Sequence, residues 1–183
     1  MFFIEVDSEI KLALTMPKYA QDIFKLIDSN RDFLSQWFPW VEHVKEVKDT
    51  EKFINTRLEH LLNNTALHTT IIYNNKVVGC LDFTVIDDFN KRAGIGYWLD
   101  EAHNGKGIMS RAVWKLICIG FEEYKFEKIF IDCEVINCRS CNLAKRLGFT
   151  HEGVLRKHYN INGIQKDMNF YGLLREDWDR KMI

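Results

Sequence analysis

The sequence lacks the features that mark several common classes of binding protein. No apolar run is long enough to cross a membrane, and the first residues, Met1 to Asp7, turn acidic too early for a signal peptide. The formal net charge is −1, with basic and acidic residues interspersed, which disfavours a basic face for nucleic acid. No internal repeat, low-complexity segment or linker is present. We therefore expect a cytoplasmic protein that binds neither nucleic acid nor a membrane.

The cysteines lack the spacing of a metal site or a disulfide framework. Their number is odd in a chain with no secretory signal, which indicates a reducing compartment. Cys138 and Cys141 form a single C-x-x-C, without a second such pair and without paired histidines. Small buried or half-buried thiols are therefore favoured over redox or metal chemistry, and we expect no metal. The five cysteines are Cys80, Cys118, Cys133, Cys138 and Cys141.

The 183 residues suffice for one well-buried domain, which we expect to span 1–183, since 46% of them are hydrophobic and 13% aromatic. Alternating polar and apolar residues over 9–14 predict a first strand, followed by a helix with Thr15 as N-cap and Pro17 in its first turn. A second helix is expected after Asp49. Its predicted apolar face comprises Ile54, Leu58, Leu61 and Leu62.

The middle of the chain predicts a meander of strands and then a crossover. Runs 67–73 and 76–86 are β-branched and aromatic, and Asn74-Asn75 between them tolerates positive φ, so they predict an antiparallel hairpin. Strand 93–99, a glycine turn, a helix and strand 128–135 predict a right-handed βαβ unit with parallel strands. Ligand then belongs at the carboxyl ends of the strands, at residues 100–107. Asn137 is expected to cap a helix over 140–147 that Gly148 ends, before a closing hairpin of 149–160 and 165–174.

The glycine turn predicts an anion site. Gly105 and Gly107 permit unusual φ/ψ values that leave several N–H groups free, and the following helix aims its positive dipole end at the same point. Such a turn suits a pyrophosphate. A dinucleotide fingerprint is excluded because Leu99 stands where its third glycine should be. A P-loop is excluded because Gly107, not Ser or Thr, follows Lys106.

The same stretch resembles the acyl-CoA site of the GNAT superfamily of N-acetyltransferases. The signature Q/R-x-x-G-x-G/A falls on 104–109, where Gly107 matches and Asn104 and Met109 do not. Whether Asn104 and Met109 weaken CoA binding is open. The pattern N-x-x-S-x-x-x-x-x-x-x-G-F, from Asn137 and Ser140 to Gly148-Phe149, is a more specific match.

Two further segments are similar to the ribosomal-protein N-terminal (serine/alanine) acetyltransferase branch of that superfamily. One is the tail from Gly163 through Asp167 to Tyr171, and the other is the Leu-x-x-Trp-x-Pro-Trp run within 33–40. The resemblance implies an α/β (α+β) fold of GNAT type. Its central sheet is mostly antiparallel, with one parallel splayed pair, and is flanked by helices.

The resemblance also implies acetyl-CoA as co-substrate and a role for each matching residue. The pantetheine arm would pair with the backbone of Tyr97, Trp98 and Leu99, with the Leu99 N–H stabilising the oxyanion. Asn137 would bond the same arm, and Ser140 would give a proton to the departing thiolate. The pyrophosphate would lie on backbone N–H groups of Asn104, Gly105, Lys106, Gly107, Ile108 and Met109.

Each of these roles has an alternative explanation. Asn137 and Ser140 are also residues that a helix start favours, without catalysis. The side chains of Lys106 and Arg111 either meet CoA phosphates or are only solvated. Trp37 and Trp40 either form a wall for the acceptor substrate or fill the core. The general base stays open among Glu134, Asp82, Asp100, His158 and Tyr159.

The expected reaction is direct attack, in a ternary complex, by the N-terminal amine of a ribosomal protein or similar polypeptide. An N-terminal amine has a pKa of about 8 and is neutral far more often at pH 7 than a lysine of pKa about 10.4, so it needs less help from a base. One alternative acceptor is a small amine, such as a polyamine, an aminoglycoside or an amino acid. Another alternative is a CoA-binding or interaction module without turnover. A homo-oligomer is compatible with the sequence.

Overall fold

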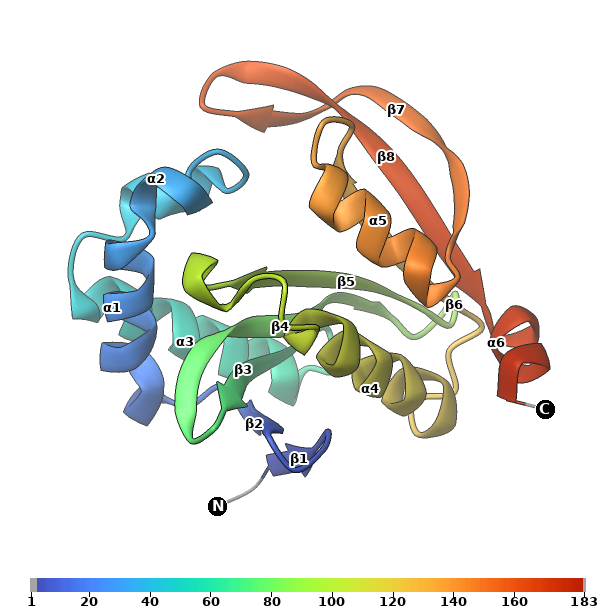
Figure 1. Cartoon of the computed structure of the whole chain (residues 1–183), viewed down its shortest axis with the longest axis horizontal. Helices are drawn as coiled ribbons and strands as arrows, with labels where there is room; N and C mark the ends of the chain where they lie inside the picture. Colours follow the sequence, from blue (N-terminus) through green and yellow to red (C-terminus); the bar gives the residue numbers. More distant parts are fainter. Residues whose placement is uncertain (1–2, 183) are drawn as a thin grey trace.

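The computed structural model describes residues 3–182, through which runs one sheet of eight strands in the order β1-β2-β3-β4-β5-β6-β8-β7 (Figure 1). The strands are β1 (Phe3–Glu5), β2 (Ile10–Leu14), β3 (Leu67–Tyr73), β4 (Lys76–Asp87), β5 (Arg92–Leu99), β6 (Lys128–Glu134), β7 (Thr150–Ile161) and β8 (Ile164–Leu174). The helices are α1 (Ala20–Ser29), α2 (Arg31–Leu34), α3 (Val47–Leu62), α4 (Ile108–Glu122), α5 (Cys138–Leu147) and α6 (Arg175–Met182). No helix in this described part is long and apolar enough to span a membrane.

The parallel pair β5–β6 is short, and its two strands then separate. Pairing runs from Arg92–Lys128 to Gly94–Phe130, whereas β5 continues to Leu99 and β6 to Glu134. The other neighbouring strands pair antiparallel. Figure 1 shows the result as two arms, one carrying β4 and β5 and the other β7 and β8, that diverge toward α1 and α2. The predicted mixed sheet with one parallel splayed pair is confirmed.

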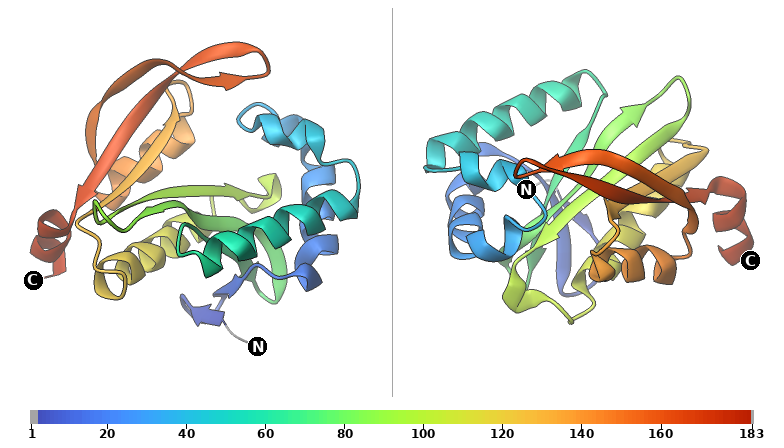
Figure 2. Two further views of the ribbon diagram at one scale, coloured as in Figure 1. Left: turned by 180° about the vertical axis from the view of Figure 1, so that it is seen from behind. Right: turned by 90° about the horizontal axis from the view of Figure 1, so that it is seen from above.

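Helices cover both faces of the sheet and bury two apolar clusters. Helix α4 packs its buried stripe, which includes Ala112, Val113, Leu116 and Ile117, against the central strands on one face. Helices α1 and α3 enclose a second cluster around Ile23 and Ile54 on the other face. Figure 2 shows α3 and α4 on opposite sides of β4 and β5. The apolar helix predicted after the glycine turn is therefore confirmed.

The starts of the two N-terminal helices differ from the sequence prediction. The Thr15 hydroxyl does not cap a helix, because it lies 2.9 Å from the Thr70 hydroxyl across β2 and β3. Helix α3 begins two residues before Asp49, whose carboxylate completes a capping box with Glu46. Leu62 is 85% exposed rather than on the apolar face, because α3 ends there.

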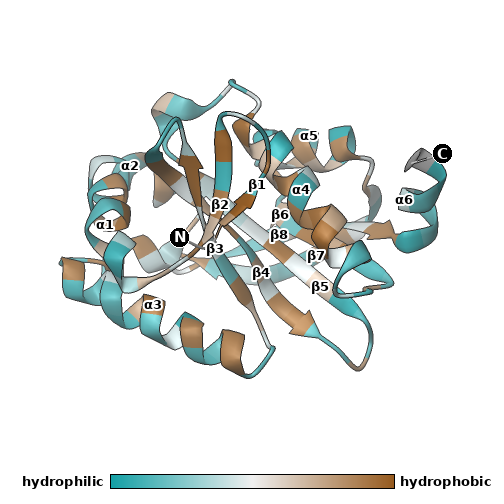
Figure 3. Cartoon of the chain, turned by 90° about the horizontal axis from the view of Figure 1, so that it is seen from below, coloured by the Kyte–Doolittle hydropathy of each residue, from teal (hydrophilic) through white to brown (hydrophobic). Residues whose placement is uncertain are grey.

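The C-terminal helix α6, which the sequence did not predict, is mostly hydrophilic (Figure 3). Trp178 attaches it to the core, with its ring centroid 5.3 Å from that of Phe121 on α4.

We expect Gly120→Ala on α4 to destabilise the protein. A Cβ at this position would lie 2.8 Å from Ile129 Cδ1 and 2.9 Å from Phe83 Cζ. This overpacking costs about 1–3 kcal/mol, more than the gain of about 1 kcal/mol in helix propensity. The measurement is the urea midpoint of unfolding, with exposed Glu122→Ala as a control that stays within about 0.5 kcal/mol of wild type. An unchanged or higher midpoint for Gly120→Ala would contradict the packing described here.

Candidate active site

A cavity of about 1360 Å³ opens where β5 and β6 separate, and it reaches the first turns of α4 and α5. The β7–β8 hairpin bounds it above (Figure 2), and the Asn162 amide at the hairpin tip donates to the Ser35 carbonyl at 3.2 Å. The structure brings nearly all predicted site residues to this cavity. Those in its lining are Trp37, Trp40, Tyr97, Trp98, Leu99, Asn104, Gly105, Gly107, Ile108, Met109, Asn137 and Ser140. Lys106 is exposed and does not belong to the lining.

The glycine turn presents a cluster of backbone donors to the cavity. Gly105 and Gly107 have φ values of 77° and 71°, and a Cβ on either would meet no protein atom within 4 Å. The N–H groups of residues 105–110 have no acceptor among the described residues. The Asn104 N–H, by contrast, donates to the Glu101 carbonyl at 3.1 Å. A cradle of free amides at a helix start suits a diphosphate.

The edge of β5 that faces β6 also carries free donors. The Asp100 N–H donates to the Val78 carbonyl at 2.8 Å. Because N–H groups in an antiparallel ladder alternate in direction, those of Tyr97 and Leu99 point away from β4 and into the gap. An extended ligand arm can therefore add to this edge as a strand does.

Ser140 has a capped backbone N–H and a hydroxyl that pairs with a tyrosine. Asn137 caps α5, since its Oδ1 accepts the Ser140 N–H at 3.1 Å, so the predicted capping is confirmed. The Ser140 Oγ lies 2.6 Å from the Tyr97 hydroxyl. Burial raises the pKa of Tyr97, so the phenol stays protonated near neutral pH. The pair can hold and pass a proton beside the gap.

The sequence motif assigned a role only to the backbone of Tyr97, so the contact between its phenol and Ser140 was not predicted. The one available signal was the strand alternation, which turns Tyr97 toward the same side as its buried neighbours Ile95 and Leu99.

The cysteines nearest this pair are buried thiols. Cys133 Sγ on β6 lies 3.5 Å from Cys141 Sγ on α5, and neither forms a disulfide. Burial raises the pKa of Cys133 to about 12, so the thiolate needed for nucleophilic attack is scarce. Cys138 is exposed. Residues 3–182 hold no cluster of side chains with metal-ligating geometry.

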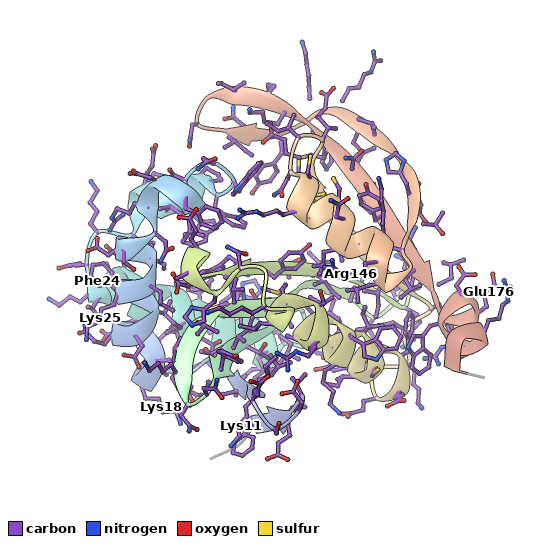
Figure 4. All side chains as sticks on the ribbon, viewed as in Figure 1. Lys11, Lys18, Phe24, Lys25, Arg146 and Glu176 are labelled. Atoms are coloured by element: carbon purple, nitrogen blue, oxygen red, sulfur yellow. The ribbon has the colours of Figure 1, made fainter. Side chains whose placement is uncertain are left out.

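Two arginines stand near the amide cradle, and they differ in availability. Arg111 is held by Asp7 at 2.7 Å and Glu9 at 2.9 Å, which favours a structural role. Arg146, labelled in Figure 4, reaches from α5 toward α4 and donates to the Ser110 hydroxyl at 2.9 Å. No sequence motif points to Arg146, because only the packing of α5 on α4 brings it to the cradle.

The candidate general bases separate into two groups. Asp82 is buried against His68, 2.6 Å from its Nδ1, and does not line the cavity. The Asp100 carboxylate lies 2.6 Å from His103 Nδ1. Neither Asp100 nor His158 lines the cavity. Glu134 and Tyr159 do line the cavity, as does Asp132, which sequence reasoning did not consider.

The aromatic segment before α3 lines the cavity and also packs on the core. Trp40 contacts the second apolar cluster, and its ring centroid lies 6.4 Å from that of Trp98 on β5. Trp37 is half-buried in the cavity wall. The segment therefore both packs on the core and lines the cavity.

Comparisons with known proteins agree with this geometry. A sequence profile of the acetyltransferase (GNAT) domain matches residues 11–150. The ribosomal-protein-serine acetyltransferase of Escherichia coli strain K12 is 31% identical over 168 residues, which cover 92% of this chain and 94% of that protein.

Solved structures extend the similarity to nearly the whole chain. The microcin self immunity acetyltransferase MccE, in complex with acetyl-CoA and AMP, is 35% identical with a TM-score of 0.90, and the match covers 93% of this chain and 95% of that one. RimL, a ribosomal alpha-N-protein acetyltransferase, was solved with coenzyme A in disulfide linkage to a cysteine. It is 28% identical with a TM-score of 0.92, over 96% of this chain and 99% of that one.

Proposed function

Because the chain belongs to the acetyltransferase (GNAT) family and is an N-acetyltransferase, we propose that it moves the acetyl group of acetyl-CoA to the N-terminal amine of a ribosomal protein or similar polypeptide. The observation that carries this proposal is the parted β5 edge, whose free N–H groups share one cavity with the amide cradle and with Ser140. The similarity to a ribosomal-protein-serine acetyltransferase and to RimL favours the polypeptide acceptor.

The residues present fit acetyl-CoA. The diphosphate lies on the amides of 105–110, and Arg146 adds a cation beside them. The pantetheine arm runs along β5 and places the thioester carbonyl at the Leu99 N–H. Lys106 contributes its backbone N–H, while its side chain reaches a phosphate only from outside the cavity.

The reaction proceeds by direct attack while both substrates are bound. The neutral amine adds to the thioester carbon, and the Leu99 N–H stabilises the oxyanion that forms. Collapse of the tetrahedral intermediate forms the amide and breaks the C–S bond. As the amide forms, its nitrogen loses one proton to solvent. Ser140 gives its proton to the leaving thiolate and is reprotonated from Tyr97, 2.6 Å away, and the Tyr97 proton is restored from solvent.

A small amine is the second candidate acceptor, because Asp132 and Glu134 put two carboxylates on the cavity wall. Acidic groups suit a cationic substrate such as a polyamine. On the same wall, Trp37 and Trp40 offer apolar surface to the side chains of a peptide.

The experiment that separates the acceptors is mass spectrometry after incubation with acetyl-CoA. The substrates are unstructured peptides that begin with Ser or Ala, with spermidine and free lysine in parallel. We expect an acetyl group on the peptide N-terminus. Transfer to the small amines alone would overturn the polypeptide assignment.

Initial-rate kinetics test the order of events. Double-reciprocal plots at several fixed peptide concentrations should intersect, because both substrates bind before either product leaves. Parallel lines with an isolable acetyl-enzyme would refute direct transfer.

The cytoplasm is the proposed compartment. The close approach of Cys133 and Cys141 as free thiols fits a reducing environment.

A further inference from the structure

Strand β6 presents different chemistry on its two faces where it leaves β5. Cys133 points to the side of α5, where Ser140 and Tyr97 meet. Successive side chains alternate across a sheet, so Asp132 and Glu134 point to the opposite side. Met168, which is paired with Glu134 across β6 and β8, faces the same side and lines the cavity. The gap between β5 and β6 thus has proton donors on one face and carboxylates on the other.

Glu134 is the buried carboxylate of this face. It is 6% exposed, and its Oε1 lies 2.9 Å from Lys166 Nζ on β8. Its Oε2 is buried and has no hydrogen-bond partner among residues 3–182. A buried carboxylate oxygen without a donor is costly unless a ligand supplies one. Since Glu134 lines the cavity, an ammonium group bound there can supply that donor.

The register of the parallel pair indicates which residue of β5 lies opposite Glu134 along the gap. Arg92, Ala93 and Gly94 pair with Lys128, Ile129 and Phe130. Continued in the same register, Glu134 is level with Trp98, one residue before the Leu99 N–H. Asp132 is level with Gly96, nearer the closed end of the gap. Glu134 is therefore the carboxylate at the height of the thioester carbonyl.

We propose that Glu134 Oε2 binds the acceptor ammonium group and takes its proton before attack. This inference rests on the acetyl transfer proposed above. The ammonium N–H bond breaks, its electron pair stays on nitrogen, and Glu134 becomes a neutral carboxylic acid that later releases the proton to solvent. The amine then forms the C–N bond, and as the tetrahedral intermediate collapses the nitrogen loses its second proton to solvent and the C–S bond breaks. The thiolate takes its proton from Ser140, on the other face, and solvent restores that proton through Tyr97.

The neighbours of Glu134 suggest an alternative explanation, in which its carboxylate serves only as an ion-pair partner. Lys166 on β8 is the group in contact with the carboxylate. Asp132 shares its face, and Tyr159 on β7 and Arg139 on α5 line the same cavity. If Glu134 serves only as the partner of Lys166, removal of either member should have the same effect. If Glu134 is the base, only its own removal stops proton transfer.

Three glutamine variants separate these explanations. Glu134→Gln keeps the shape and removes the base, and Lys166→Gln breaks the same ion pair but leaves the carboxylate. Glu152→Gln is the matched control, because it breaks the Lys128–Glu152 pair, 2.6 Å long, outside the cavity. For each variant, kcat/KM is measured at pH 7 and pH 9.5 with a peptide that begins with Ser, and with spermidine in parallel. CoA affinity is measured by calorimetry.

We expect Glu134→Gln to lower kcat/KM for the peptide by about 100-fold at pH 7, with CoA affinity unchanged. At pH 9.5 the deficit should shrink to about tenfold, because an amine of pKa about 8, about a tenth neutral at pH 7, is then almost fully neutral. Lys166→Gln should lose less than about tenfold, and Glu152→Gln should stay within about twofold.

Equal losses in Glu134→Gln and Lys166→Gln would overturn the inference, as would a Glu134→Gln deficit that is the same at both pH values. A wild-type protein that acetylates only spermidine would overturn the polypeptide acceptor instead. Glu134 would then be tested by the same three-variant comparison on spermidine. A wild-type protein that acetylates neither probe would overturn both proposals.

Discussion

Replacing Ser140 with alanine is expected to lower kcat by about 100-fold and to leave the Kd for CoA within about twofold. Ser140 is 8% exposed and lines the cavity, and in the proposed reaction its hydroxyl is the proton donor to the leaving sulfur. Loss of a positioned general acid typically costs 10²–10⁴-fold. The measurement is thiol release at saturating acetyl-CoA and peptide, with Kd from calorimetry.

The fold should tolerate this change, because Asn137 caps α5 through the backbone N–H of residue 140 and not through the hydroxyl. Tyr97→Phe is the companion variant. If the two hydroxyls pass one proton in sequence, the double variant should lose little more than Ser140→Ala alone. An unchanged kcat in Ser140→Ala, or losses that multiply in the double variant, would contradict the relay.

A carboxylate placed in the glycine turn is expected to abolish most CoA binding. Residue 107 has a φ of 71°, a conformation that both Asn and Asp adopt more readily than other side chains. Gly107→Asn and Gly107→Asp therefore differ mainly in charge. A negative charge about 4 Å from a phosphate costs up to about 4 kcal/mol near a protein surface, less after screening. We expect the Kd of CoA to be about 30–100-fold weaker for Asp than for Asn.

Pantetheine, which lacks the phosphates, is the control ligand for this pair of variants. Its affinity should be equal for Gly107→Asn and Gly107→Asp, because it does not reach the turn. If the two variants bind CoA equally well, the diphosphate does not lie on the amides of 105–110.

Elements with strong local signals were predictable from the sequence. The hairpin β3–β4 turns at Asn74 and Asn75, whose φ values of 47° and 63° match the preference of asparagine for this region. Helix α4 follows its apolar stripe, and Gly148 ends α5 with a φ of 86°. In each case, residues within a few positions of one another decide the structure.

Features that depend on distant contacts were not predictable. Strand β1 (Phe3–Glu5) is three residues long and exists because it pairs with β2. The Tyr97–Ser140 hydrogen bond joins residues 43 positions apart. Arg111 meets Asp7, 104 positions away, and this ion pair is neither of the two environments, phosphate contact or solvation, that the sequence left open for its side chain. No local sequence pattern encodes these long-range contacts.

The predicted site residues meet at one cavity because their motifs lie at the ends of adjacent elements. Gly107 starts α4 and Asn137 caps α5, and both helices begin at the open end of the β5–β6 gap. The carboxylates of the cavity lining were less predictable. Glu134 was one of several candidate bases in the sequence, and only its burial and its unpartnered oxygen distinguish it.

A crystal structure of the protein with bound acetyl-CoA tests the proposed cofactor position at once. We expect diphosphate oxygens within hydrogen-bond distance of the amides of 105–110, the pantetheine arm along β5, and the thioester carbonyl oxygen at the Leu99 N–H. A cofactor bound elsewhere, with the gap between β5 and β6 closed by protein, would contradict it.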